Sequence, residues 1–154
     1  MFQSEAVAGT FRFRRIESEL FETMGLSAAR ATDPAAKVVL NELSRHHGWR
    51  AEQWQLDVDP VVEAPPGSAR PDLAGWNAVV GAIEAAASDP SGVATVESFA
   101  AVVGPWMQNS YQLHLAMADP ISDAATIRTL GRVMNDLAAD VRMAEGMLGV
   151  TFRA

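Results

Sequence analysis

Residues 34–56 read PAAKVVLNELSRHHGWRAEQWQL, and the spacing of side chains in this stretch decides the fold. Steps of three and four residues place side chains on one face of an α-helix, and here they connect Ala36, Leu40, Leu43, His47, Arg50 and Trp54. His47 and Arg50 occupy positions on this face that a core normally gives to leucine. Burying an imidazole and a guanidinium without partners is strongly unfavourable. We therefore expect the facing helices to supply carboxylates, a metal ion or trapped water.

Composition limits the classes of protein to which the chain can belong. The chain has 154 residues, 49% of them hydrophobic, which is enough for one domain spanning residues 1–154 with a sizeable core. A formal net charge of −7 argues against nucleic-acid and membrane partners, which require a basic surface. Cysteine is absent, and we find no apolar stretch long enough for a signal peptide or a membrane span. We expect a soluble, cytoplasmic protein.

Helical periodicity dominates the rest of the chain, and alternating β-branched patterns typical of strands are missing. The sequence therefore predicts an all-α fold. Asp33 and Asp72 are the expected N-caps of the second and third helices, Ser122 is the expected N-cap of the last, and a kink is expected at Gly104–Pro105. The predicted helices span residues 7–30, 34–56, 73–87, 93–118 and 123–148.

The lengths of the connections predict the topology. Tight turns near Thr32 and Pro120 make two helical hairpins, whereas residues 58–93 form a passage long enough to travel the length of a bundle. Two hairpins joined by one long crossover is the ferritin-type arrangement of a four-helix bundle. Here the crossover would carry the short helix at 73–87.

The first hairpin also carries a sequence resemblance. Residues 17–22 (ESELFE) and 42–52 (ELSRHHGWRAE) together resemble the first hairpin of the ferritin-like superfamily. In that superfamily a glutamate on the first helix faces a Glu-x-x-His pair on the second, and both bind a di-iron or related centre. Glu17 and His47 stand fifteen residues on either side of Thr32, so they can meet at one level of the hairpin.

The chain departs from the pattern of that superfamily at the ligand positions. Residues 47–50 read HGWR where the family has Glu-x-x-His, and Arg50 cannot bind a metal ion. The second hairpin offers Tyr111, His114, Asp136 and Asp140 in place of another glutamate and another Glu-x-x-His. Asp140 lies beside the apolar stripe of its helix, whereas Asp136 lies farther round. The resemblance therefore implies a ferritin-like arrangement of helices whose di-metal site is altered or lost.

Three hypotheses describe the inward polar residues, and the sequence leaves all three open. In the first, Arg50 takes the place of a lost cation opposite Glu17, and His47 and Tyr111 complete the hydrogen bonds of a purely structural network. In the second, a single iron, manganese or zinc ion binds to Glu17, His47, His114 and Asp140. In the third, an inward pocket holds a small organic ligand against Arg50, Trp54, Met107 and Tyr111.

We expect the chain to act as a small-ligand-binding or protein-interaction module, with no cofactor or with one such ion. The alternative is a non-haem, iron- or manganese-dependent oxidoreductase. A homodimer is the expected partner arrangement. It would form through apolar residues of the crossover or through the terminal residues Val150, Thr151 and Phe152.

Overall fold

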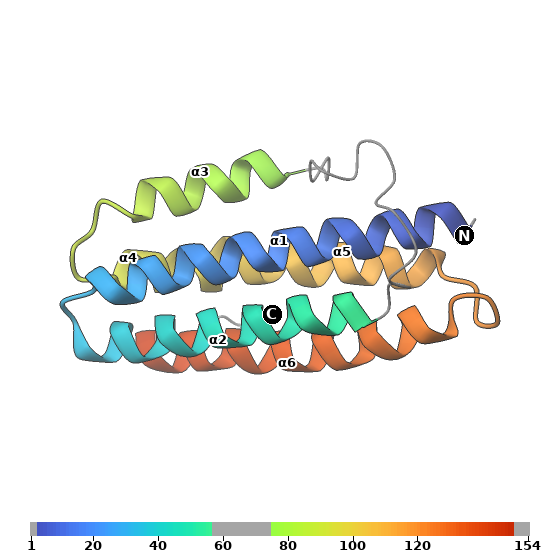
Figure 1. Cartoon of the computed structure of the whole chain (residues 1–154). Helices are drawn as coiled ribbons and strands as arrows, with labels where there is room; N and C mark the ends of the chain where they lie inside the picture. Colours follow the sequence, from blue (N-terminus) through green and yellow to red (C-terminus); the bar gives the residue numbers. More distant parts are fainter. Residues whose placement is uncertain (1–2, 57–74, 150–154) are drawn as a thin grey trace.

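The computed structural model describes residues 3–56 and 75–149, and within these ranges no residue lies in a strand (Figure 1). The prediction of an all-α fold is confirmed. The elements in chain order are α1 (Gln3–Arg30), α2 (Pro34–Leu56), α3 (Trp76–Ala86), α4 (Val93–Ser98), the π-helical turn η1 (Phe99–Val103), α5 (Gly104–Met117) and α6 (Ala124–Leu148). In the part of the chain that the structure describes, no helix is long and apolar enough to cross a membrane.

The first hairpin forms as the sequence predicts. Asp33 caps α2, because the backbone N–H of Ala36 donates to Asp33 Oδ1 at 2.8 Å. Pro34 then occupies the first helical position, where a missing N–H costs nothing. The short turn makes α1 and α2 an antiparallel pair (Figure 1). Farther along, the Ser44 hydroxyl donates to the carbonyl oxygen of Phe21 at 2.8 Å and ties the two helices together.

The elements α4, η1 and α5 form one continuous helical rod with a single wide turn inside it. The N–H of Gly104 donates to the carbonyl oxygen of Phe99, five residues earlier, as in a π-helix. The next residue, Pro105, has no N–H, and its ring would crowd the carbonyl four residues before it. The wide turn accommodates this proline, so the irregularity expected at Gly104–Pro105 takes the form of a π turn.

Gly104 also sets the distance between two helices. A Cβ atom at this position would lie 2.5 Å from Val141 Cγ2 on α6, which is closer than real Cβ atoms approach. The absence of a side chain therefore lets the start of α5 pack directly on α6.

The directions of the long helices follow from the lengths of their connections. Figure 1 shows the rod of α4, η1 and α5 running in the same direction as α2, whereas α6 runs back in the direction of α1. The chain leaves α2 at one end of the molecule and enters α4 at the other. The linking residues, 57–92, include α3, which packs on α4 and η1.

Three helix starts differ from the expectation. The first helix begins at Gln3 rather than at residue 7. The third helix begins at Trp76 rather than at residue 73, after Gly75, whose φ of +87° lies in the left-handed region. The expected Asp72 cap lies outside the described residues. The last helix begins at Ala124, with Asp123 rather than Ser122 as its N-cap residue. Ser122 is held instead in the preceding turn, where its backbone N–H donates to Asp119 Oδ1 at 2.9 Å.

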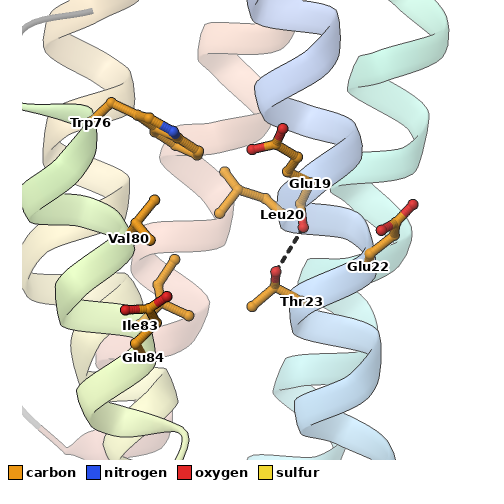
Figure 2. Close-up of a pocket in the computed structure, with 8 residues that line it drawn as sticks. All are labelled: Glu19, Leu20, Glu22, Thr23, Trp76, Val80, Ile83 and Glu84. Atoms are coloured by element: carbon orange, nitrogen blue, oxygen red, sulfur yellow. Dashed lines mark hydrogen bonds between the residues drawn. The ribbon is translucent and has the colours of Figure 1, made fainter. Parts of the chain in front are cut away.

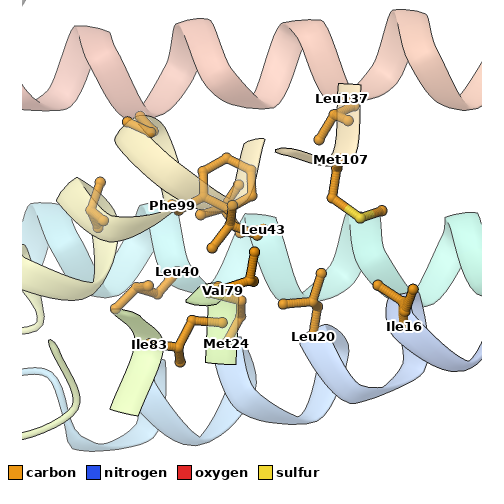
Figure 3. Close-up of a cluster of buried hydrophobic side chains, with 14 of the residues drawn as sticks. Ile16, Leu20, Met24, Leu40, Leu43, Val79, Ile83, Phe99, Met107 and Leu137 are labelled. Carbon is orange, nitrogen blue, oxygen red and sulfur yellow. The ribbon is translucent and has the colours of Figure 1, made fainter. Parts of the chain in front are cut away.

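Buried side chains from every long helix meet along the axis of the molecule, and α3 adds its own apolar face (Figure 3). Burial of each such side chain contributes about 1.5–3 kcal/mol. Fully or almost fully buried members are Ile16, Leu20, Met24, Leu40, Leu43, Val79, Phe99, Met107 and Leu137. This core encloses most of the polar residues described next.

Candidate functional sites: a buried polar network and an open cleft

A polar network lies inside the core and joins four helical segments. We define this buried polar network by its six members: Glu17 of α1, His47 and Arg50 of α2, Tyr111 of α5, and Asp136 and Asp140 of α6. All members are 0–1% exposed except Asp136, which lies at the edge and whose side chain is 25% exposed. Sequence reasoning anticipated a partnered interior site, and the structure places one there.

Arg50 is the centre of the network. Its Nε donates to Glu17 Oε1 at 3.0 Å, and its Nη1 donates to Asp140 Oδ2 at 2.7 Å and also to Asp136 Oδ2. Burial alone would lower the pKa of Arg50, but the neighbouring Glu17 and Asp140 carboxylates outweigh burial and raise it. Arg50 is therefore a permanent cation among three carboxylates.

Glu17 accepts a hydrogen bond from each of three neighbours. Its Oε1 receives Arg50 Nε and the hydroxyl of Tyr111, and its Oε2 lies 2.5 Å from His47 Nδ1. Burial raises the pKa of Glu17, yet the charge of Arg50 and the His47 and Tyr111 hydrogen bonds hold the pKa below its ordinary value. The predicted meeting of Glu17 and His47 at one level of the hairpin is confirmed.

The neighbours of His47 define its protonation state. Its Nδ1 lies 2.5 Å from Glu17 Oε2 and 3.0 Å from Arg50 Nη2, and one ring nitrogen cannot both donate to the first and accept from the second. Because an ionised Glu17 can only accept, we place the proton on Nδ1, so the approach of Arg50 Nη2 is not a hydrogen bond. Burial and the charge of Arg50 lower the pKa of His47, which is therefore neutral near pH 7.

The other ring nitrogen of His47, Nε2, is buried without a hydrogen-bond partner among the described residues. The ring lies edge-on to Phe99 of η1, with the ring centroids 5.8 Å apart. In the tautomer assigned above, Nε2 carries a free lone pair in apolar surroundings. The Nε2 atom is therefore a hydrogen-bond acceptor to which no described residue donates.

The four residues predicted to hold a ligand, Arg50, Trp54, Met107 and Tyr111, are all fully buried. Trp54 Nε1 donates to the Tyr111 hydroxyl oxygen at 3.4 Å, and the Trp54 ring stacks on Phe13 with centroids 5.2 Å apart. None of the four lines either of the clefts described below. Arg50 and Tyr111 belong to the buried polar network, whereas Trp54 and Met107 pack in the core. Their predicted role in binding a ligand stays a prediction.

The four predicted metal ligands do not gather around one point. Glu17 and His47 are in contact, and Asp140 is joined to Glu17 through Arg50. His114 lies elsewhere, against the ring of Phe13 at a centroid distance of 5.3 Å and beside Gly9. His114 is three residues beyond Tyr111 on α5, nearer the end of that helix, which explains the separation.

A different set of ligand atoms does come together at the edge of the network. Among the described residues, His46, Asp136 and Asp140 each offer one ligand atom, and these atoms lie within 4.8 Å of one another. His46 Nδ1 is 2.5 Å from Asp140 Oδ1. As expected, Asp136 lies farther round its helix than Asp140, with side chains 25% and 1% exposed. The His46 side chain is 24% exposed. The signal that could have found the set is the four-residue spacing of Asp136 and Asp140, which puts both carboxylates on one face of α6.

An open cleft of about 250 Å³ separates α1 from α3 (Figure 2). We call it the α1–α3 cleft; its lining residues are Glu19, Leu20, Glu22, Thr23, Trp76, Val80, Ile83 and Glu84. Figure 2 shows Trp76 and the Glu19 carboxylate at one end of the cleft and Ile83 and Glu84 at the other. Sequence analysis gave no indication of this cleft, because it depends on where α3 lies against α1.

A second, shallower groove runs over the outer face of the first hairpin. Its lining includes two exposed aromatic residues, Phe21 and Trp49, together with Arg45 and Glu52, and its volume is about 500 Å³. The terminal residues 150–152, predicted to take part in a homodimer, lie outside the described residues.

Comparison with known proteins adds no further evidence. No protein-family model, curated protein sequence or solved structure matches this chain.

Proposed function

We propose that this chain is a ferritin-type four-helix bundle that binds a small ligand, and that its internal cation is Arg50 rather than a metal ion. The directions of the long helices, with one passage along the length of the molecule, support the ferritin-type arrangement. Fold alone does not determine function, so the proposal depends on the chemistry of the two candidate sites.

The chemistry of the buried polar network argues for a structural role. The Arg50 guanidinium already bonds to Glu17, Asp136 and Asp140, three carboxylates that a metal ion would otherwise require. The surrounding core is closely packed and neither described cleft reaches these residues. A substrate would have to displace well-formed hydrogen bonds to enter.

The observation that carries the binding function is the α1–α3 cleft. It is open to solvent, has apolar walls from Leu20, Val80 and Ile83, and has carboxylates at its rim. A concave site that combines apolar walls with a few polar groups is the usual form of a small-molecule site. We conclude that the bundle stabilises the protein and that the added helix α3 creates the binding site.

The experiment that tests this function is amide chemical-shift mapping with a library of small aromatic and aliphatic fragments. We expect at least one fragment to shift amides of residues 19–23 and 76–84. Val80→Phe, which fills the cleft, should abolish these shifts, whereas the matched control Val38→Phe, on the exposed face of α2, should retain them. Fragments that bind both variants equally, or no binding at all, would refute the proposal.

A second function, a metal-dependent oxidoreductase, is favoured by one specific observation: the grouping of His46, Asp136 and Asp140. Nitrogen and carboxylate ligands suit manganese, iron or zinc. An ion here would have to compete with Arg50, whose Nη1 bonds to both aspartates. Metal analysis of tag-free protein from iron- and manganese-supplemented medium tests this, beside His46→Ala and the Glu17→Ala/His47→Ala double variant. A stoichiometric metal that His46→Ala removes would favour the enzyme.

We also propose that the chain forms a homodimer, which would give it a role in protein interaction. The outer groove with Phe21 and Trp49 is an exposed apolar surface on which such a contact could form. Sedimentation equilibrium of the whole chain tests this prediction, and a monomer at all concentrations would contradict it.

A further inference from the structure

We infer that the α1–α3 cleft takes an organic cation with a compact apolar body, such as an aryl-alkyl ammonium ion. This inference rests on the proposed ligand-binding function and names the class of ligand. It draws on three features of the cleft: the shape of its walls, the sign and spacing of its charges, and the position of Trp76.

The walls of the cleft fit an apolar body of limited size. Leu20 contributes from α1, and Val80 and Ile83 contribute from α3, so both sides of the gap are apolar (Figure 2). A volume of about 250 Å³ lies slightly below the usual range of small-molecule sites, about 300–1,000 Å³, so only a compact ligand fits. The hydroxyl of Thr23 already donates to the carbonyl oxygen of Glu19 at 2.8 Å and is not free to donate to a ligand.

The charges of the cleft select a cation. All three charged residues that line it are glutamates, and among the described residues neither Glu22 nor Glu84 has a hydrogen bond or ion pair. Glu19 shares its Oε1 with Arg15 Nε at 2.8 Å, which leaves Oε2 available. An anion would be repelled both by these carboxylates and by the net charge of −7.

The spacing of the carboxylates favours an organic cation over a metal ion. A metal ion needs several ligand atoms close together, and the described residues provide three such atoms at His46, Asp136 and Asp140 but not at Glu19, Glu22 and Glu84. Carboxylates spread along a cleft instead create a diffuse negative potential. Such a potential attracts a large, weakly hydrated cation whose apolar part fills the space between them.

Trp76 supplies the aromatic surface that such a cation prefers. Its ring lies at the same end of the cleft as the Glu19 carboxylate (Figure 2). The Trp76 ring also contacts the Trp106 ring, with ring centroids 5.4 Å apart and a 42° angle between the ring planes. A cation near Trp76 would combine attraction to the aromatic face with attraction to a carboxylate.

The test compares three probes of one shape and different charge: 2-phenylethylammonium, 2-phenylethanol and phenylacetate. Calorimetric titration into the full chain at low salt should show the ammonium binding at least tenfold more tightly than the alcohol, and no binding of phenylacetate. Added sodium chloride should weaken the binding of the ammonium probe but not that of the alcohol, because salt screens charge attraction.

Substitutions separate the charge of the site from its shape. Glu19→Gln/Glu84→Gln should reduce the preference for the ammonium to less than threefold and leave the affinity for the alcohol unchanged. Glu97→Gln, an exposed glutamate on α4 that does not line the cleft, is the matched control and should change neither affinity. Trp76→Leu should lower the affinity for the ammonium probe more than the affinity for the alcohol.

The outcomes distinguish failure of this inference from failure of the proposed function. If the alcohol binds as tightly as the ammonium and Val80→Phe abolishes both, the cleft is a ligand site and its selectivity for cations is refuted. If no probe binds, or if Val80→Phe changes nothing, the inference fails together with the use of this cleft as the binding site. Tenfold selectivity that the glutamine variants remove would support both.

Discussion

The buried polar network and the α1–α3 cleft each contain three carboxylates, but the two regions differ in how these carboxylates are paired and exposed to solvent. Inside the network, Glu17, Asp136 and Asp140 share one guanidinium, and two of the three are fully buried. In the cleft, Glu22 and Glu84 face solvent and form no ion pair within the described residues. Buried charges must be paired for the fold to exist, whereas exposed charges are free to meet a ligand. Substitutions should therefore affect stability in one region and binding in the other.

The largest effect should come from Arg50→Met, which keeps much of the side-chain volume but removes the charge. Glu17 and Asp140 would lose their shared cation in the core, and breaking a buried pair in this way costs about 3–5 kcal/mol. Urea unfolding followed by circular dichroism measures the loss. Arg50→Lys, which restores the charge but not the forked geometry, should recover part of it.

Arg45→Met is the matched control for this prediction. Arg45 lies five residues before Arg50 on the same helix, but its ion pair with Glu42 is at the surface and its side chain is 65% exposed. We expect an unfolding midpoint close to that of the parent chain. Equal losses from the two arginine variants would show that the network is not the element that stabilises the core.

Tyr111→Phe should give the next largest effect. The hydroxyl of Tyr111 donates to the charged Glu17 carboxylate and accepts from Trp54 Nε1. A hydrogen bond to a buried charged group contributes about 1.5–3 kcal/mol, so we expect a loss of that order. Ser110→Ala, at the neighbouring position, removes a hydroxyl that bonds only to a backbone carbonyl of its own helix and should cost less. Similar losses for the two variants would contradict the central role of Glu17.

The stability of the chain should also depend on pH through the network, with a smaller effect. Burial and the charge of Arg50 lower the pKa of His47 below its ordinary value of 6.5. The unfolded chain therefore binds a proton that the folded chain does not, and stability falls as the pH drops below 6.5. Each unit of pKa difference contributes about 1.4 kcal/mol. Glu17, whose pKa is also lowered, should add a further loss as the pH falls below 4.5.

On the alkaline side the sign is reversed. Burial and the charge of Glu17 raise the pKa of Tyr111 above its ordinary value of 10.0, so stability falls as the pH rises past 10. Unfolding free energies measured from pH 4 to pH 11 should show a plateau between these limits. Tyr111→Phe should remove the alkaline decline. On the acid side, His114→Gln serves as the control, because burial also lowers the pKa of His114. We expect the loss of stability below pH 6.5 to remain in this variant. If the loss disappears, His114 and not His47 is its cause.

The two regions also differ in how far the sequence predicts them. The polar network was predictable because Glu17, His47 and Arg50 lie on two helices that are joined by a short turn. In such a hairpin, three- and four-residue spacing determines which side chains face the partner helix. Asp136 lies farther round α6 than Asp140, as expected. Its part in the network was not predicted, because a helical wheel gives the direction of a Cβ atom and not the reach of an arginine. Arg50 extends far enough from α2 to bond to both aspartates.

The cleft was not predictable from any periodic pattern. Its two walls come from α1 and α3, whose separation depends on how α3 packs on α4 and η1. Trp76 and Val80 stand four residues apart, a spacing that is typical of the inner face of an ordinary helix. Only the position of that helix outside the four long helical segments leaves part of this face open.

The smallest stability effect should come from the cleft, and Glu84→Gln is the clearest case. Glu84 is exposed and has no ion pair among the described residues, so its neutralisation removes no stabilising contact. Surface substitutions of this kind change stability by about 0.5 kcal/mol or less. The change should even be favourable, because the chain carries a net charge of −7 and loses one repelling carboxylate. Urea unfolding at low salt measures the change in the free energy of unfolding for Glu84→Gln. Glu97→Gln, which removes an exposed carboxylate outside the cleft, is the control. A loss of stability as large as that of Tyr111→Phe would mean that the charges of the cleft are part of the fold, and the contrast between the two regions would fail.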